Sequence, residues 1–185
     1  MEAQQKGRVI VDLDGVERID DETIANVRSD LFKWQLSQFP DRYGADMAED
    51  LRLGIFEELG ELAHAILKRR QGIRGMDVDR AFEFARDDAI GDVLVYASQL
   101  FRAHTVAGGD AARLFGDSGT TSRRLALFYC DHHGIKDQEP WGFNYMVAAV
   151  AVAASVSIAH AKLCFVETAR KVMKRTDRTE TREEV

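Results

Sequence analysis

The chain has 185 residues, of which 45% are hydrophobic and 30% charged, enough apolar material for one core and too little length for two comfortable domains. Its 25 Lys and Arg against 31 Asp and Glu give a net charge of -6, which argues against a surface that binds nucleic-acid phosphates. Two prolines, four tyrosines and no alternating β-branched runs after residue 20 leave little material for a sheet. We therefore predict one all-α domain over residues 1–185.

The first residues lack the basic, apolar and small-residue order of a secretory signal peptide, and two cysteines do not make a disulfide framework. This pattern predicts a protein of the reducing cytoplasm. The stretch from Phe143 to Ala159 carries no charge, but it is alanine-rich and shorter than the about 20 strongly apolar residues that cross a membrane. We expect no membrane partner, and a helix buried in a bundle or a dimer.

Residues 8–19 read RVIVDLDGVERI, two apolar runs on either side of Asp14-Gly15, a composition typical of a small β-hairpin. Residues 1–20 are therefore predicted to form an N-terminal hairpin or arm. The same letters match the Asp-x-Asp-Gly strand of haloacid-dehalogenase phosphatases, in which Asp12 would attack and Asp14 would carry a proton. The hairpin is the better interpretation, because nothing downstream alternates strands and helices as such a site requires.

Apolar periodicity predicts helices over residues 22–38, with Asp21 as N-cap, and over residues 45–70 and 78–104. Residues 106–142 form an insertion of unknown role, with a shorter helix at 121–133. A last long helix is predicted over residues 144–175, and residues 177–185 form a charged, frayed tail. The expected fold is a bundle of four to five long helices.

The second predicted helix contains GIFEELGELAHAILK and gathers like charges on one side. At about 100° per residue, one arc of this helix holds Glu57, Glu58, Glu61, His64 and Lys68. A solvated helix face usually mixes charges three or four residues apart, yet none of the three glutamates has a Lys or Arg at that spacing. The cluster therefore indicates a site rather than an ordinary polar face.

Residues 89–101 of the third predicted helix read AIGDVLVYASQLF, and Asp92 is the only charged residue in this stretch. A helix that is apolar all round is buried, and a carboxylate buried without a partner is costly. The nearest charge one turn back is Asp88, which is also acidic. Two such helices in contact would need a cation between them, and Mg²⁺, with Mn²⁺ as a second choice, suits oxygen ligands. A satisfied hydrogen-bond network is the alternative.

These residues carry a resemblance to a known family. EELGE at residues 57–61 and DAIGDVLVY at residues 88–96 resemble the Glu-Glu-x-x-Glu and Glu-x-x-Asp half-motifs of the MazG-like all-α nucleoside triphosphate pyrophosphohydrolases. KWQLSQFP, HAILKRRQGIRG and the late Lys171-Val172-x-x-Arg175 are also similar to members of that family. The similarity covers roughly residues 25–105 and a short C-terminal piece.

The resemblance implies a helical bundle, usually a homodimer or homotetramer, that cleaves an NTP or dNTP to NMP and pyrophosphate. By matching positions, Glu58, Glu61 and Asp92 would hold Mg²⁺, and Glu57 would lie near a second ion or the attacking water. The residues expected at the substrate are Lys171 and Arg175 at the phosphates, with Lys68 as a further candidate, and Trp34 or Gln35 near the base.

The chain departs from the family pattern at one position. Ala89 stands where the family has the glutamate of Glu-x-x-Asp, and Asp88 lies one position earlier. Helical geometry places residue 88 close enough in angle to residue 92 to face the same ion, so we predict Asp88 as the fourth carboxylate ligand.

Three alternatives stay open on the sequence. A zinc site could be assembled from a scattered set of thiol and imidazole groups: Cys130, His132, His133, His160 and Cys164. Glu61 and His64 have the Glu-x-x-His spacing of di-iron bundles, but a second copy of that motif is absent. A bundle that binds nucleotides or a partner without turnover, with a degenerate metal site marked by Ala89, is the third.

The charge-free stretch of residues 143–159 also predicts assembly. With Val147, Val150, Val152 and Val156 it offers more apolar surface than a helix in a small bundle normally needs. We expect it to be covered in a homodimer or homotetramer.

Overall fold

The computed structural model describes residues 9–11, 17–40, 45–106 and 143–175. The predicted helix at 121–133, the rest of residues 107–142 and the tail lie outside these residues. So do Asp12, Asp14, Cys130, His132 and His133, and the alternatives built on them are not addressed by the structure.

A short antiparallel pair of strands precedes the helices, as the hairpin interpretation predicts. Strand β1 (Val9–Val11) pairs with β2 (Glu17–Ile19), with Val9 opposite Ile19. Ile19 is buried in the core, and β2 contacts helix α6. The pair therefore ties the N-terminal part of the chain to the helical bundle.

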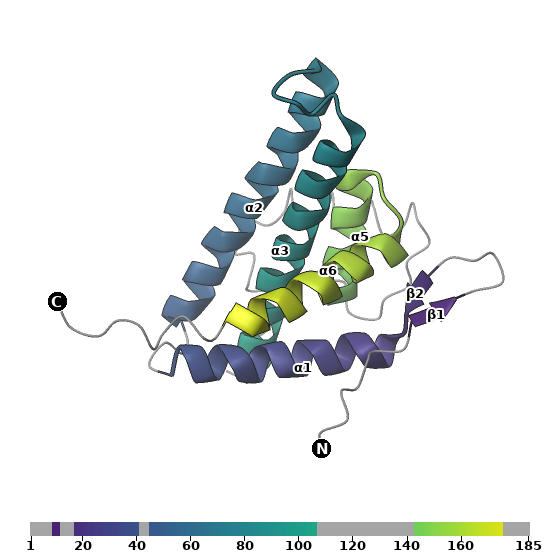
Figure 1. Ribbon diagram of the computed structural model, residues 1–185. Helices are drawn as coiled ribbons and strands as arrows, with labels where there is room; N and C mark the ends of the chain where they lie inside the picture. Colours follow the sequence, from purple (N-terminus) through teal and green to yellow (C-terminus); the bar gives the residue numbers. More distant parts are fainter. Residues whose placement is uncertain (1–8, 12–16, 41–44, 107–142, 176–185) are drawn as a thin grey trace.

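Helices form the body of the molecule and confirm the all-α prediction (Figure 1). They are α1 (Asp21–Gln38), α2 (Ala45–Gln71), α3 (Asp79–Val106), α5 (Phe143–Ala154) and α6 (Ile158–Met173). α2 and α3 run side by side as a long pair, α1 lies across one end, and α6 crosses α3. The N-cap of α1 is Asp20 rather than the predicted Asp21, because Asp20 has extended backbone and accepts a hydrogen bond from the Thr23 amide at 2.6 Å.

Helix α3 is the centre of the bundle, since α1, α2, α5 and α6 all contact it. Its fully buried side chains include Ile90, Val93, Leu94 and Ala97. This burial is what the apolar run of residues 89–101 predicts. Any charged side chain on this part of α3 must therefore be accommodated at a helix contact.

The prediction of one long helix over residues 144–175 is wrong, because the chain turns by 109° between α5 and α6. Ser155 adopts the left-handed conformation with φ of 57°, and the Val156 amide donates to the Ala151 carbonyl at 2.9 Å. Ser157 then caps α6 by accepting a hydrogen bond from the His160 amide at 3.0 Å. The turn uses serines, so neither glycine nor proline marks it in the sequence.

Helix α5 packs against α3 and α6 of its own chain. Most of its side chains are buried, including Val147 and Val150. No single helix in the described residues is long and apolar enough to cross a membrane; α5 and α6 meet that test of length and composition only together, as a bent pair. The apolar surface that led us to expect a dimer through residues 143–159 is therefore largely covered by the chain's own core.

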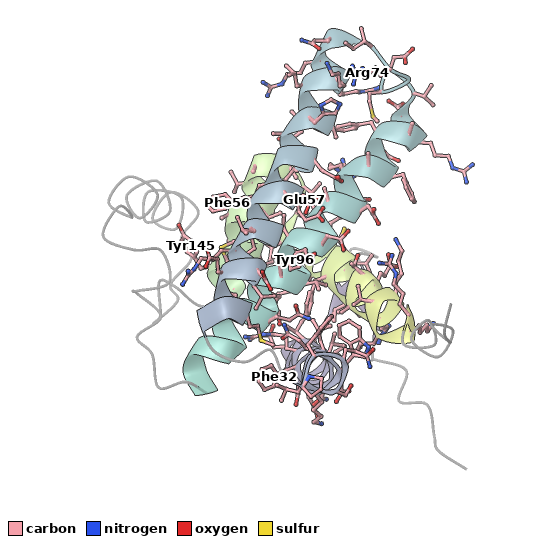
Figure 2. All side chains as sticks on the ribbon, turned by 90° about the vertical axis from the view of Figure 1, so that its left-hand side faces the viewer. Phe32, Phe56, Glu57, Arg74, Tyr96 and Tyr145 are labelled. Carbon is pink, nitrogen blue, oxygen red and sulfur yellow. The ribbon has the colours of Figure 1, made fainter. Side chains whose placement is uncertain are left out.

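Two glycines allow the helices around α3 to approach closely. A Cβ at Gly91 would lie 2.0 Å from Thr168 Oγ1 and 3.0 Å from the Cys164 carbonyl oxygen, so α6 rests directly on the α3 backbone. A Cβ at Gly54 would lie 2.6 Å from the ring of Tyr96, which occupies the space between α2 and α3 (Figure 2). These contacts set the relative positions of α2, α3 and α6.

Replacement of Gly91 by Ala should lower the free energy of unfolding by about 1–3 kcal/mol, because the new methyl group overlaps Thr168 and the α6 backbone. Asn26→Ala, at an exposed position of α1, is the control and should raise stability by less than about 0.7 kcal/mol through helix propensity. Urea unfolding followed by circular dichroism measures both changes. Equal effects of the two substitutions would contradict the close approach of α6 to α3.

Candidate active site

A cavity of about 420 Å³ lies where α1, α2, α3 and the end of α6 meet. Its lining combines aromatic, amide, acidic and basic side chains, among them Trp34, Gln35, Glu58, Asp92, Tyr96 and Arg175. These residues come from four separate segments of the chain. The tertiary fold therefore brings one carboxylate from each acidic half-motif together with the late arginine and the first helix.

A second, more open hollow of about 550 Å³ lies beside α2 and α3. Glu57, Glu61, His64 and Asp88 line it, and both glutamates are exposed. The predicted carboxylates are thus divided: Glu58 and Asp92 line the first cavity, and the others line the neighbouring hollow. Glu61 and His64 form the one Glu-x-x-His motif in the sequence. A di-iron bundle needs two such motifs, so the di-iron alternative gains no support.

Glu58 is the carboxyl group most affected by this crowding. Its pKa is raised from 4.5 to about 7, first by burial and then by the negative charges of Asp92, Glu61, Glu57 and Asp88. Removal from water and like-charge repulsion both disfavour the ionised form. The site therefore carries more negative charge than its own environment stabilises.

Asp92 has no basic residue three or four positions away on its own helix, and its counter-charges come from α6 and the residues that follow it. Burial and Asp88 raise the pKa of Asp92, whereas Lys171 and Arg175 lower it, and the net direction is upward. The two cations only partly offset the burial of the carboxylate. The search for a counter-charge along the third helix could not find these two cations, because they come from a segment far away in the sequence.

Asp88 forms an ion pair with Lys171, the lysine predicted to bind phosphate. Lys171 Nζ donates to Asp88 Oδ1 at 2.9 Å, and both side chains are substantially exposed. Ala89, where the family pattern has its glutamate, is 2% exposed and belongs to the core. A longer acidic side chain at position 89 would therefore replace a core methyl group, which explains why the carboxylate stands at 88.

Lys68 is the one predicted substrate residue that the fold does not bring to the site. It lies near the end of α2, donates to Gln71 Oε1 at 3.4 Å, and lines neither hollow as far as the described residues define them. Its ten-residue separation from Glu58 corresponds to about 15 Å along the helix. His160 and Cys164, considered above for zinc, also lie outside both hollows.

The end of the cavity at α1 contains buried polar atoms that lack partners. Trp34 Nε1 and Gln35 Oε1 have no hydrogen-bond partner among the described residues. Gln35 is only 4% exposed, so bulk water does not replace the missing partner. Gln99, also buried, lines the same cavity. An unsatisfied buried polar group costs about 1–3 kcal/mol, so a ligand that supplies one acceptor and one donor would be favoured here.

Sequence reasoning missed Asp50, Tyr96 and Gln99 as lining residues. Tyr96 and Gln99 follow Asp92 by four and seven residues, the spacing that puts side chains on one helix face. Burial and the charges of Glu58 and Asp92 raise the pKa of the Tyr96 hydroxyl, so it stays protonated as a donor. Helical spacing from Asp92 would have identified both residues.

Comparison with protein-family models, with curated proteins and with solved structures finds no match for this chain. The resemblance to the MazG-like family therefore rests on the short motifs quoted above, and functional assignment rests on the chemistry of the site.

The raised pKa of Glu58 predicts a pH-dependent stability in metal-free buffer. The pKa of Glu58 is higher in the folded chain than in the unfolded chain. The free energy of unfolding is therefore highest, as far as Glu58 contributes, below about pH 4.5, and it falls as the pH rises towards about 7. Glu58→Gln should flatten this part of the profile of unfolding free energy against pH. Glu83→Gln, at an exposed position of α3, is the control and should leave the profile of the wild type. Identical profiles for wild type and Glu58→Gln would refute the crowding of charge at Glu58.

Proposed function

We propose that this chain is a nucleoside triphosphate pyrophosphohydrolase, which uses Mg²⁺, or Mn²⁺ in its place, to hydrolyse an NTP or dNTP to NMP and pyrophosphate. The observation that carries the proposal is the shared cavity in which Glu58 and Asp92 lie with Trp34 and Arg175. Carboxylates for a cation, a basic group for phosphate and an aromatic ring for a base are the components that such a substrate requires.

The side chains present fit a hard divalent cation. The cluster offers carboxylate oxygens, which Mg²⁺ prefers, and the upward shift of the Glu58 pKa reflects an excess of negative charge that a cation would relieve. Glu58, Glu61, Asp88 and Asp92 would hold the ion. When bound, Mg²⁺ supplies charge neutralisation at the phosphate oxygens and acidifies the attacking water.

The chain's own residues divide the remaining tasks. Glu57 is exposed and adjacent to Glu58, and it would accept a hydrogen bond from the water that attacks the phosphate. Lys171 would leave Asp88 and bind the phosphate chain, since its side chain is about half exposed and can swing without unpacking α6. Arg175, at the rim of the cavity, would bind a second phosphate oxygen.

The α1 end of the cavity would receive the base. Trp34 offers an aromatic surface and an unpartnered N–H, and Gln35 offers an unpartnered acceptor beside it. A nucleobase edge carries both acceptors and donors, so it would satisfy these groups together once the two side chains turn their buried polar atoms towards the cavity. This complementarity supports a nucleotide substrate over a small phosphate ester that lacks a base.

Asp92→Asn and Glu61→Gln should each lower kcat by about 100-fold or more, because each removes a charged group at the reacting phosphates. The measurement is pyrophosphate release from a panel of NTPs and dNTPs with Mg²⁺ and with Mn²⁺. Glu83→Gln, with the same chemical change at an exposed position of α3, should keep the rate of the wild type.

Release of orthophosphate alone, or full activity in both site variants, would contradict the proposal. Nucleotide binding without turnover by the wild type would instead favour the non-catalytic bundle with a degenerate metal site.

We also propose that the chain assembles as a homodimer or homotetramer through α2 rather than through residues 143–159. The outer face of α2 exposes residues every third or fourth position: Leu53, Phe56, Gly60, Ala63 and Leu67. This spacing forms a straight apolar seam, with large side chains towards its ends and small ones at Gly60 and Ala63. In an antiparallel pair of α2 helices, Phe56 of each copy would lie over the small residues of the other.

Phe56→Gln should shift the protein towards a monomer of 20.8 kDa, as measured by sedimentation or light scattering at micromolar concentration. Ile158→Gln is the control, because Ile158 is an exposed apolar residue of α6 (44%) and does not belong to the α2 seam. A wild type that is monomeric at these concentrations, or the same shift in both variants, would contradict assembly through α2.

A further inference from the structure

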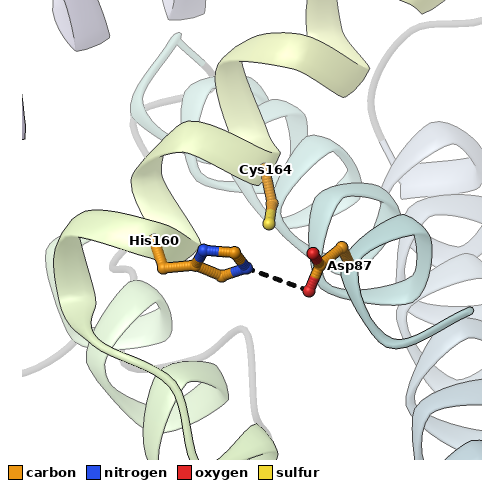
Figure 3. A group of neighbouring side chains, drawn as sticks. All are labelled: Asp87, His160 and Cys164. Atoms are coloured by element: carbon orange, nitrogen blue, oxygen red, sulfur yellow. Dashed lines mark ion pairs between the residues drawn. The ribbon is translucent and has the colours of Figure 1, made fainter. Parts of the chain in front are cut away.

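A cluster of potential metal ligands lies at the contact between α3 and α6. It consists of Asp87 from α3 and His160 and Cys164 from α6, and one ligand atom from each lies within 4.8 Å of the others. His160 Nε2 is 3.0 Å from Asp87 Oδ1, and the thiol of Cys164 points into the same space (Figure 3). His160 and Cys164 are four residues apart, the spacing that brings two ligands to one face of a helix.

The surroundings suit a partly enclosed ion. Cys164 is 5% exposed, the side chains of His160 and Asp87 are each about one-third exposed, and the His160 Nε2 atom that faces Asp87 is itself buried. Arg86 Nε donates to Asp87 Oδ1 at 2.8 Å, which fixes the orientation of the carboxylate beside His160.

The cluster does not have the properties of a reactive cysteine. Burial, followed by the charges of Asp87 and Glu167, raises the pKa of the Cys164 thiol to about 12. A thiol in this state is a poor nucleophile. A metal ion would change this, because a coordinating thiol gives up its proton, which passes to solvent.

The donor set distinguishes this cluster from the acidic site. One sulfur, one imidazole nitrogen and one carboxylate oxygen match a borderline transition metal such as Zn²⁺, whereas Mg²⁺ prefers oxygen ligands alone. A tetrahedral ion about 2.0–2.3 Å from each ligand atom requires these atoms to be about 3.3–3.6 Å apart. His160 Nε2 and Asp87 Oδ1 are 3.0 Å apart, and all three ligand atoms lie within 4.8 Å of one another, so small side-chain rotations would bring them to this spacing.

We propose that Asp87, His160 and Cys164 bind Zn²⁺, with a water molecule in the fourth position. The ion would join α3 to α6 one turn from Gly91 and two turns before Lys171. It would therefore hold α6, and with it the cations that face Asp88 and Asp92, in a fixed position. This site does not depend on the proposed hydrolase activity.

The test uses the full-length protein, stripped with EDTA and titrated with Co²⁺ as a spectroscopic probe for Zn²⁺. One equivalent should bind with tetrahedral visible bands and a thiolate-to-cobalt charge-transfer band, and Zn²⁺ should abolish these bands while excess Mg²⁺ should not. Cys164→Ser should remove the charge-transfer band, and His160→Gln should weaken Co²⁺ binding by at least about tenfold.

Cys130→Ser is the matched control, because the chain has two cysteines and this change leaves Cys164 in place. It should retain the band, as should Glu58→Gln at the acidic cluster. Asp87→Asn, at a position about one-third exposed, serves as a second site variant if Cys164→Ser fails to fold. It should weaken Co²⁺ binding and keep the thiolate band at saturation.

Several results would overturn the proposal. These are octahedral Co²⁺ spectra without a thiolate band, loss of the band in Cys130→Ser but not in Cys164→Ser, and unchanged affinity in both His160→Gln and Asp87→Asn.

Discussion

The close contact of α6 with α3 at Gly91 decides where the charged groups of this protein meet. Gly91 lies between Asp88 and Asp92, and Thr168 of α6 occupies the space that a side chain there would fill. The next turns of the chain carry Lys171 and Arg175, which lower the pKa of Asp92. A wider separation of the helices would leave Asp92 half-buried with acidic neighbours and no cation within reach.

The same contact has a second consequence on the other side of α3. Asp87 precedes Asp88 by one residue, about 100° around the helix, and so faces His160 and Cys164 instead of Lys171. Two neighbouring aspartates thus belong to two clusters with different donor chemistry. One cluster is rich in oxygen and negative charge, and the other combines oxygen, nitrogen and sulfur.

The acidic cluster is a case in which a site works against the stability of its own fold. Burial and the charges of four neighbouring carboxylates raise the pKa of Glu58. Burial and Asp88 also raise the pKa of Asp92, and there Lys171 and Arg175 offset the rise only in part. The unpartnered atoms of Trp34 and Gln35 add a further cost at the other end of the cavity. Both features disfavour the folded chain alone, and the cation and the base proposed above would relieve them.

The sequence by itself determined the local structure and the identity of the acidic groups. Apolar periodicity was sufficient for α1, α2 and the buried run of α3, and the absence of compensating charges three or four residues away identified Glu57, Glu58 and Glu61. Only the tertiary structure decided which groups meet across helices. The turn at Ser155, the pairing of Lys171 with Asp88, the burial of Ala89 and the meeting of Asp87 with Cys164 all depend on contacts between distant segments. Periodicity along one helix specifies a face but not its neighbour, because the neighbour is chosen by packing, and here that packing depends on the missing side chain of Gly91.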